Sequence, residues 1–350
     1  MSRPGVLVVF LALLAVPATS QTGGKWQFQA RMQVGSEYDS NIFESTRFPV
    51  EAMAARGLLK TSASRTLAQG KLALGWSAGM QLYPAWTAEN KLNHLLSAAW
   101  GRALSRWWSI SLKANAQAKF FLRAPYDHVW TWTAAGSTFR LPAGLRLKVQ
   151  AASARLDYRA SDRFDFLERS LVADLGRRFA RRWQAGLGVE HSRLEFLRPA
   201  YFAGENGVRI IRAAQQQDTR RTFFLRLAYS GPRVVQVRLE QQSNDSNSEG
   251  YSWQRRRLYL VAAQPLATSW LLRIALMGQR KRYTPTALAI PLIELDLERS
   301  ESNYLIIDLT YDRSRQFSWL IRLALYNNEA AFRGFYYSKR QLLLGSEYRF

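Results

Sequence analysis

Strict alternation of apolar and polar residues is the feature that most constrains the fold of this chain. In segment 108–122 every even position is apolar, and the odd positions from 111 to 119 are polar. Because successive side chains of a β-strand point to opposite faces, this segment is expected to form a strand with one apolar and one polar face. Segment 26–38 has the same pattern and is the first strand expected.

The same period of two recurs along the chain, and the period typical of helices is almost absent. Further strands are predicted at 72–82, 92–100, 145–151, 171–179, 183–189, 223–229, 235–239, 258–262, 270–276, 305–311, 319–325 and 342–350. Segment 129–141 is also predicted to be a strand, although its pattern does not fix which face is apolar. The alternation therefore predicts an all-β fold.

The first residues form a separate pattern. One cation, Arg3, precedes an apolar run over 6–16, and Ala18 and Ser20 are small residues before Gln21. This order predicts a secretory signal peptide over residues 1–20 and a mature chain over 21–350. An uncleaved anchor is the alternative, but the run is shorter than the ~20 apolar residues that a transmembrane helix needs.

No later apolar run is long enough to cross a bilayer as a helix, so a mature chain in a membrane would have to be a closed barrel. The chain contains no cysteine, which excludes disulfides and thiolate metal sites. Two candidates remain. A soluble periplasmic sandwich would bury the apolar faces, whereas an outer-membrane barrel would turn them to lipid.

Aromatic residues at one end of the apolar faces favour the barrel. A soluble core has no reason to collect aromatics at one strand end, whereas a membrane interface does. The predicted belt, assigned to the periplasmic side, consists of Trp26, Trp108, Phe179, Trp183, Tyr229, Trp270, Tyr311, Trp319, Tyr348 and Phe350.

Connections of alternating length favour the barrel too. Tight turns at 105–106, 142–144, 230–232 and 312–314 alternate with longer stretches such as 197–218 and 284–302. Transmembrane barrels have short periplasmic turns and long outer loops. Together these features predict a transmembrane antiparallel up-and-down β-barrel in the outer membrane of a Gram-negative cell.

The segments named above make fifteen strands, whereas bacterial single-chain barrels have an even number. With both termini in the periplasm, segments 26–38 and 72–82 would both run outward, so a returning strand must lie between them. We place it within 52–65, where Leu59, Thr61 and Ala63 form a weak apolar face. The prediction is a barrel of about sixteen strands, with fourteen as the alternative, and such a barrel encloses an aqueous channel unless loops fill it.

Two segments resemble known proteins. The final strand, with Leu342, Leu344, Tyr348 and Phe350, resembles the C-terminal strand that the outer-membrane assembly machinery recognises. Segment 35–43 resembles the opening of outer-membrane porins associated with exopolysaccharide loci, and it is similar to the start of the barrel of surface-lipoprotein assembly modifiers. Both resemblances imply an outer-membrane barrel. An assembly modifier would carry a helical repeat domain first, whereas only residues 21–25 precede this barrel.

Within that opening, Asp39, Ser40 and Asn41 are turn-forming residues at a strand exit. Their oxygens suit a hard cation such as calcium as well. A structural turn is the expected role, with the cation site as the alternative.

The charge balance is strongly basic. Lys and Arg total 49 against 26 Asp and Glu, a formal net charge of +23. Export disfavours nucleic acid as a partner, which leaves lipopolysaccharide and other outer-membrane lipids, periplasmic polyanions or a permeating anion. The candidates for lining the pore are Arg31, Lys113, Lys119, Arg146, Lys148, Arg226, Arg238, Arg273 and Arg322. Cross-strand ion pairs that stiffen the wall are the alternative role for these cations.

The longest stretch between strands, 197–218, contains Arg209 and Arg212. If this stretch is a loop that folds inward, the two arginines are candidates for a constriction of the pore. If it faces outward, they would meet lipopolysaccharide.

Candidate catalytic groups are few. His191 and Ser192 are adjacent and would point to opposite faces of a strand, so they cannot act as a base and its nucleophile. His94 falls on an apolar face, and His128 is expected in a loop beside Asp127. We therefore expect no enzyme, no cofactor and no metal site.

The predicted function is an outer-membrane pore or export conduit for hydrophilic solutes, with anions favoured. The alternative is a structural or assembly barrel whose loops plug the lumen and which binds a surface polysaccharide or a partner protein. Only the first would conduct ions.

Overall fold

The computed structural model describes residues 24–68, 70–203, 209–284, 302–328 and 337–350. The predicted signal peptide, residues 1–20, lies outside this part of the chain. The described residues form an antiparallel barrel of sixteen strands, closed by pairing of the first strand with the last. The strands are β1 (Gln27–Asp39), β2 (Ala52–Leu67), β3 (Gly70–Leu82), β4 (Lys91–Ala103), β5 (Trp108–Phe121), β6 (His128–Arg140), β7 (Leu145–Tyr158), β8 (Phe166–Phe179), β9 (Trp183–Ala203), β10 (Arg209–Ser230), β11 (Val234–Ser246), β12 (Trp253–Ala267), β13 (Trp270–Tyr283), β14 (Ser302–Asp312), β15 (Phe317–Asn328) and β16 (Ser338–Arg349).

This architecture confirms the predicted all-β barrel and its sixteen strands. The strand that parity required is β2, which pairs with β1 on one side and β3 on the other. Two short 3₁₀ helices, Thr87–Glu89 and Pro142–Gly144, interrupt the connections. No helix among the described residues is long and apolar enough to cross a membrane.

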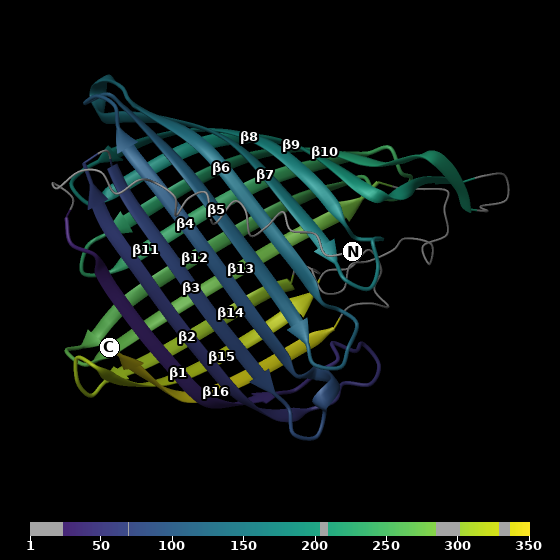
Figure 1. Cartoon of the computed structure of the whole chain (residues 1–350), viewed down its shortest axis with the longest axis horizontal. Helices are drawn as coiled ribbons and strands as arrows, with labels where there is room; N and C mark the ends of the chain where they lie inside the picture. Colours follow the sequence, from purple (N-terminus) through teal and green to yellow (C-terminus); the bar gives the residue numbers. More distant parts are fainter. Residues whose placement is uncertain (1–23, 69, 204–208, 285–301, 329–336) are drawn as a thin grey trace.

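The two ends of the barrel differ in their connections. Every connection at the end that holds the C-terminus is short, as between β4 and β5 or between β6 and β7. The tight turn at 142–144 uses positive φ angles at Ala143 and Gly144. The longer connections gather at the opposite end (Figure 1). The C-terminal end is called the short-turn rim below, and the opposite end is called the long-loop rim.

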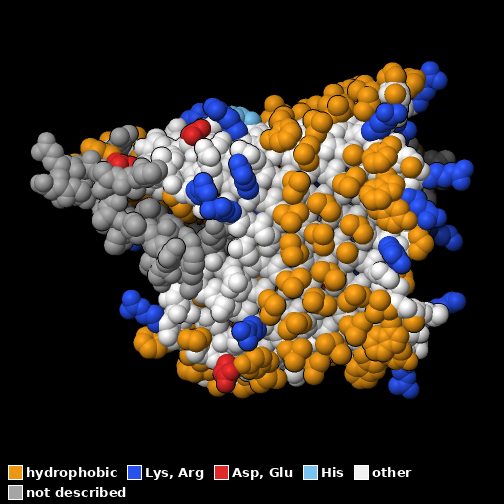
Figure 2. All heavy atoms as spheres, turned by 180° about the vertical axis from the view of Figure 1, so that it is seen from behind, with side chains coloured by type: hydrophobic (Ala, Val, Ile, Leu, Met, Phe, Trp, Pro, Cys, Tyr) orange, Lys and Arg blue, Asp and Glu red, His pale blue; other side chains and the backbone are white. Residues whose placement is uncertain are grey.

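The two faces of the wall follow the predicted alternation. Large apolar side chains such as Phe28, Met32 and Val34 are exposed on the outside, whereas Glu37 and Asp39 of the same strand are buried on the inside. Figure 2 shows the outer apolar side chains as a broad band that reaches the short-turn rim. An exposed apolar band around a closed barrel suits contact with lipid.

The strand whose facing was undecided is β6. Its register with β5 and β7 places Trp130 and Trp132 inside and Thr131 and Thr133 outside. The pattern was unreadable because polar residues lie outward here and aromatic residues inward. Trp130 packs against an inward apolar cluster of Leu156, Phe166, Leu194 and Phe196 beneath the long-loop rim.

The predicted long loop over 197–218 is wrong. β9 continues to Ala203 and β10 begins at Arg209, and both extend beyond the rest of the rim (Figure 1). Pairs such as Ile210 with Phe202 continue the ladder, interrupted by irregular register between Ile211 and Gln217. The strands were missed because a hairpin that projects past the membrane has no lipid-facing side, so its backbone pairing leaves no apolar alternation.

Close backbone approach marks the seam where β1 meets β16. Gly35 and Gly345 face each other in the register. A Cβ on Gly35 would lie 2.5 Å from the Leu344 carbonyl oxygen, and one on Gly345 would lie 2.6 Å from that of Val34. Glycine is therefore required at both positions for the barrel to close in this geometry.

Candidate functional site

All nine predicted pore-lining cations lie at inward positions of the wall. For example, Arg322 lies opposite Asp308, and Arg226 lies opposite Arg238 in the register, on the same face as Glu240. Placement on the inner wall is a property of the fold, whereas a role in conduction stays a prediction. The inner wall is thus the candidate functional site.

Four of the nine cations are paired with carboxylates of the wall, three of them across strands and one within β11. Arg322 Nε lies 2.6 Å from Asp308 Oδ1, and Arg273 Nε lies 3.3 Å from Oδ2 of the same residue. Arg226 reaches across β9 to Asp174 on β8, with its Nη2 2.7 Å from Oδ1. The fourth pair joins Arg238 Nε to Glu240 Oε1 at 2.6 Å. The wall acids therefore cancel part of the basic excess.

The side chain of Arg226 lies flat on the wall because β9 carries glycine beneath it. A Cβ at Gly186 would come within 2.6 Å of Arg226 Nε. The same Nε is buried and has no hydrogen-bond partner among the described residues. Gly186 thus lets the guanidinium reach Asp174 without projecting into the lumen.

A second group of inward cations forms no ion pair within the described part of the chain, although Asp174 lies opposite one of them, Lys148, in the β7–β8 register. It consists of Arg31, Lys60, Lys113, Arg146 and Lys148. Lys60 is the neighbour of Arg31 in the β1–β2 register, so two like charges lie side by side. Lys60 was not among the predicted pore-lining cations, because β2 was inferred from parity alone and has no readable polar face. These five residues are called the unpaired cations below.

A third group stacks cations on aromatic rings beneath the long-loop rim. Lys281 Nζ lies 4.4 Å from the Trp253 ring centre, and Arg255 lies 5.1 Å from the same ring. Arg220 approaches this ring from β10 at 5.6 Å. Lower on the wall, the Arg238 guanidinium lies 4.0 Å from the Phe224 ring. Such contacts help to hold the cations in place on the wall.

These cations on β12 and β13 were not predicted, because the predicted strand 258–262 began after the first run and the predicted strand 270–276 ended before the second. The signal was present as two basic runs, Arg255-Arg256-Arg257 and Arg280-Lys281-Arg282. The structure places the runs on neighbouring strands in register. Since every residue of each run is charged, inward and outward positions could not be distinguished by hydropathy.

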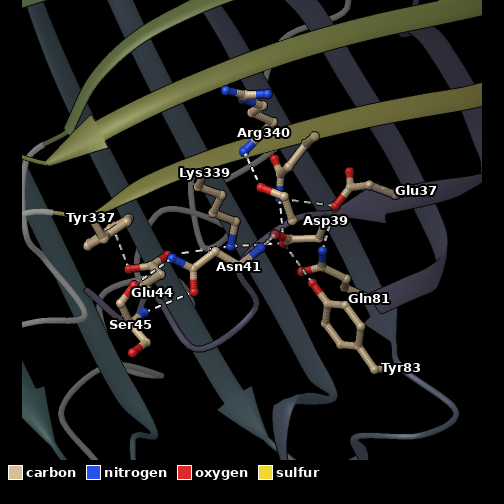
Figure 3. Close-up of polar contacts among 12 residues, drawn as sticks. Glu37, Asp39, Asn41, Glu44, Ser45, Gln81, Tyr83, Tyr337, Lys339 and Arg340 are labelled. Carbon is tan, nitrogen blue, oxygen red and sulfur yellow. Dashed lines mark hydrogen bonds and ion pairs between the residues drawn. The ribbon is translucent and has the colours of Figure 1, made fainter. Parts of the chain in front are cut away.

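The turn after β1 forms a polar cluster at the long-loop rim (Figure 3). Asp39 Oδ1 accepts the Asn41 backbone N–H at 3.0 Å, which is the predicted structural turn. Asp39 Oδ2 lies 2.9 Å from Lys339 Nζ and accepts hydrogen bonds from Gln341 at 2.9 Å and Tyr83 at 3.1 Å. The Asp39 carboxylate, which a calcium ion at this turn would need as a ligand, is thus already paired with the ammonium group of Lys339.

The same turn fastens the barrel seam. Asn41 donates its side-chain N–H groups to the carbonyl oxygens of Ser45 and Ser338, at 2.8 and 3.2 Å. The Ser40 hydroxyl accepts the backbone N–H of Arg340 at 2.9 Å. Tyr83 and Asn41 are each 1% exposed, so this part of the rim is filled by side chains rather than open to water.

The predicted aromatic belt lies on the outer face near the short-turn rim. Trp183 stacks between Phe179 and Tyr229, with ring centres 6.4 and 5.0 Å away. Trp270 and Tyr311 lie 4.9 Å apart on β13 and β14. The register also aligns Tyr311 with Trp319. The position of this rim in the periplasm remains a prediction.

The constriction candidates Arg209 and Arg212 belong to β10 rather than to a loop, which corrects their expected setting. Their side chains lie outside the described part of the structure. A loop constriction built on them therefore has no support.

The three histidines lie on three separate strands, β4, β6 and β9. On the outer face, His94 stacks on Trp76 and packs edge to face against Phe120, with ring centres 6.3 Å apart in each pair. His128 is the first residue of β6, not a loop residue, and its Nδ1 lies 3.1 Å from the Tyr126 carbonyl oxygen. No three His, Asp or Glu side chains among the described residues are placed to hold a metal ion.

Comparisons with known proteins point to the fold. No protein-family model and no curated protein sequence matches the chain. Among solved structures, the outer-membrane expressed OmpT of Vibrio cholerae aligns with a TM-score of 0.50 at 10% identity, over 95% of this chain and 99% of that chain. OccK8 (OprE) of Pseudomonas aeruginosa aligns with a TM-score of 0.45 at 6% identity, over 93% of this chain and 98% of that chain.

A bacterial polysaccharide outer membrane secretin aligns with a TM-score of 0.44 at 11% identity, over 92% of this chain and 98% of that chain. At such low identities, likeness bears on fold alone. The alignment with OmpT spans nearly the whole of both chains. Together with the closed sixteen-strand wall, it shows that this chain has the fold of an outer-membrane β-barrel.

Proposed function

We propose that the barrel is an outer-membrane pore or export conduit for hydrophilic solutes, with a preference for anions. The observation that supports this most directly is the set of five unpaired cations on the inner wall. Arg31, Lys60, Lys113 and Arg146 are exposed, so their charges meet water inside the barrel. A lumen with uncancelled positive charge concentrates anions and repels cations.

The chain reaches its membrane, in this proposal, through the leader over residues 1–20. The assembly machinery then receives the C-terminal strand. Phe350 suits such recognition, because its ring is 72% exposed and packs edge to face on Tyr348 at 4.8 Å. Lipopolysaccharide and other outer-membrane lipids would surround the apolar band.

A second candidate is a structural or assembly barrel with a plugged lumen, which binds a surface polysaccharide or a partner protein. It is favoured by burial of inward side chains near the long-loop rim. Leu194 is fully buried and Leu156 is 1% exposed in the apolar cluster there, and Asp39 is fully buried on the β1 side.

Conductance of the purified full chain in a planar bilayer separates the two candidates. The proposed pore gives stepwise current increases on insertion. A barrel that inserts without current, with heat-modifiable gel migration as proof of folding, would exclude the pore and favour the plugged barrel.

A further inference from the structure

The outer face of β12 and β13 carries a cationic patch for which the pore has no use. Arg256, Arg280 and Arg282 alternate with the inward residues Arg255 and Lys281, so all three point outward. Each is exposed, and none has an ion pair or hydrogen bond within the described part of the chain. These three residues are called the arginine patch.

Two members of the arginine patch are forced together by the register. Arg256 and Arg280 are directly opposite each other. The Cβ atoms of such a cross-strand pair lie ~5 Å apart, and like charges at this distance destabilise the sheet. An anion held between the two guanidinium groups would remove the repulsion.

A second pair of opposed arginines, elsewhere on the outer wall, is neutralised by the protein itself. Arg169 and Arg193 are also directly opposed, on β8 and β9. Glu195 lies 3.4 Å from Arg193 and 3.9 Å from Arg169. The protein thus supplies its own carboxylate at this pair. The arginine patch has no such carboxylate among the described residues.

The position of the arginine patch along the barrel axis indicates which anion could reach it. Below Arg280, the outward residues of β13 are Gly278, Leu276, Ile274, Leu272 and the belt residue Trp270. At ~3.3 Å per residue and a tilt of ~40°, the distance from Trp270 to Arg280 along the barrel axis is about 25 Å, the usual height of a lipid-facing band. Figure 2 shows cationic side chains just beyond the apolar band, on the long-loop side. This is the level of lipid headgroups.

We propose that the arginine patch binds the phosphate groups of an outer-leaflet lipid of the lipopolysaccharide type. Guanidinium groups bind phosphate through paired, charge-assisted hydrogen bonds. Two opposed arginines and a third one further along β13 would hold one phosphate between them. The proposal rests on the outer-membrane location and is independent of whether the lumen conducts.

The test compares the full barrel with its R256Q/R280Q variant in a phosphate-free detergent, with bisphosphorylated lipid A as the probe. Thermal unfolding is followed by heat-modifiable gel migration. Without lipid A, the variant is expected to be the more stable protein, because the repulsion is gone. With lipid A, the wild type is expected to become the more stable one.

Direct binding gives the second readout. The apparent affinity of the variant for lipid A is expected to fall on the order of 100-fold, the loss that accompanies removal of one or two charge-assisted hydrogen bonds. The matched control is R193Q, since Arg193 already contacts Glu195. This control is expected to retain the wild-type affinity, and R256K/R280K is expected to retain part of it.

Several outcomes would overturn the proposal. Equal affinity of wild type and R256Q/R280Q would exclude the patch as the lipid site. Equal stabilisation by inorganic phosphate would show an adventitious anion site only. Lower stability of the variant without lipid would mean that the protein itself neutralises the patch, for which the acids of 294–301 are available in the sequence.

Discussion

At the scale of single residues, the partner of each inward cation decides whether it acts on a passing ion. Arg322 and Arg273 share Asp308, so one carboxylate offsets about half of their combined charge within the wall. Arg31 and Lys60 have no such carboxylate among the described residues. Ion selectivity should therefore depend on a few identifiable cations and not on the total number of arginines.

The variant R31Q/K60Q is expected to lower the anion-to-cation permeability ratio. A unit charge ~10 Å from an ion contributes about 0.4 kcal/mol in water, or about a factor of two per charge at low salt. The control is R238Q/E240Q, which removes an ion pair without changing the net charge. A ratio that responds equally in both variants would contradict the assignment of selectivity to the unpaired cations.

Asp165, in the connection between β7 and β8, gives the long-loop rim a pH dependence. Burial raises the pKa of this carboxyl to about 6, and the neighbouring Asp157 and Asp162 add to the rise. Its Oδ1 accepts the Tyr158 backbone N–H at 2.7 Å. A raised pKa means that the Asp165 carboxyl binds its proton more tightly in the folded connection than in the locally unfolded one.

The stability of this connection should therefore decrease as the pH rises from ~4, the ordinary pKa of Asp, to about 6, and then level off. Hydrogen exchange at the Tyr158 amide is expected to be slower at pH 5 than at pH 7.5, after correction for intrinsic rates. In D165N the difference should vanish. Equal protection at both pH values in the wild type would contradict the assignment.

At the scale of elements, the strands that contact lipid were predictable from sequence, because lipid imposes an apolar face on every second residue. β5 shows this over nearly its whole length. Where that constraint is absent, prediction failed. The projecting parts of β9 and β10 were taken for a loop, and the basic runs on β12 and β13 were not recognised as strand. β2, with its weak apolar face, was found only from parity.

The placement of β2 can be tested by single cysteines, since the natural chain has none. A cysteine at Leu59 should point to lipid and resist a water-soluble thiol reagent. A cysteine at Lys60 should point inward and react with a small water-soluble reagent. Equal reactivity at the two positions would show that this segment is not a strand of the wall.

The C-terminal residue provides a second test at this scale. Deleting Phe350 removes the ring that packs on Tyr348 and the backbone N–H that donates to the Ala30 carbonyl oxygen at 3.0 Å. The yield of assembled, heat-modifiable barrel is expected to drop severalfold, whereas F350Y should assemble nearly as the wild type does. Unchanged assembly of the deletion would contradict recognition through the C-terminal strand.

At the scale of the whole molecule, the sequence predicted the closed barrel but only part of the distribution of charge inside it. Inward facing follows from alternation, so the nine cations could be placed on the wall. Their partners could not be predicted, because contacts such as Arg226 with Asp174 depend on strand order and on the space left at Gly186. The filled regions near the long-loop rim were equally hidden, since they join residues far apart in sequence.

The central claim, an anion-preferring pore, is tested most directly by the reversal potential of the wild-type channel in a salt gradient across a planar bilayer. If anions pass more easily than cations, they diffuse toward the dilute salt and leave the concentrated compartment positive at zero current. The charge of the unpaired cations predicts this sign. The preference should weaken as salt is raised, because screening shortens the reach of each charge. A cation-selective channel, or a folded barrel that passes no current, would contradict the account.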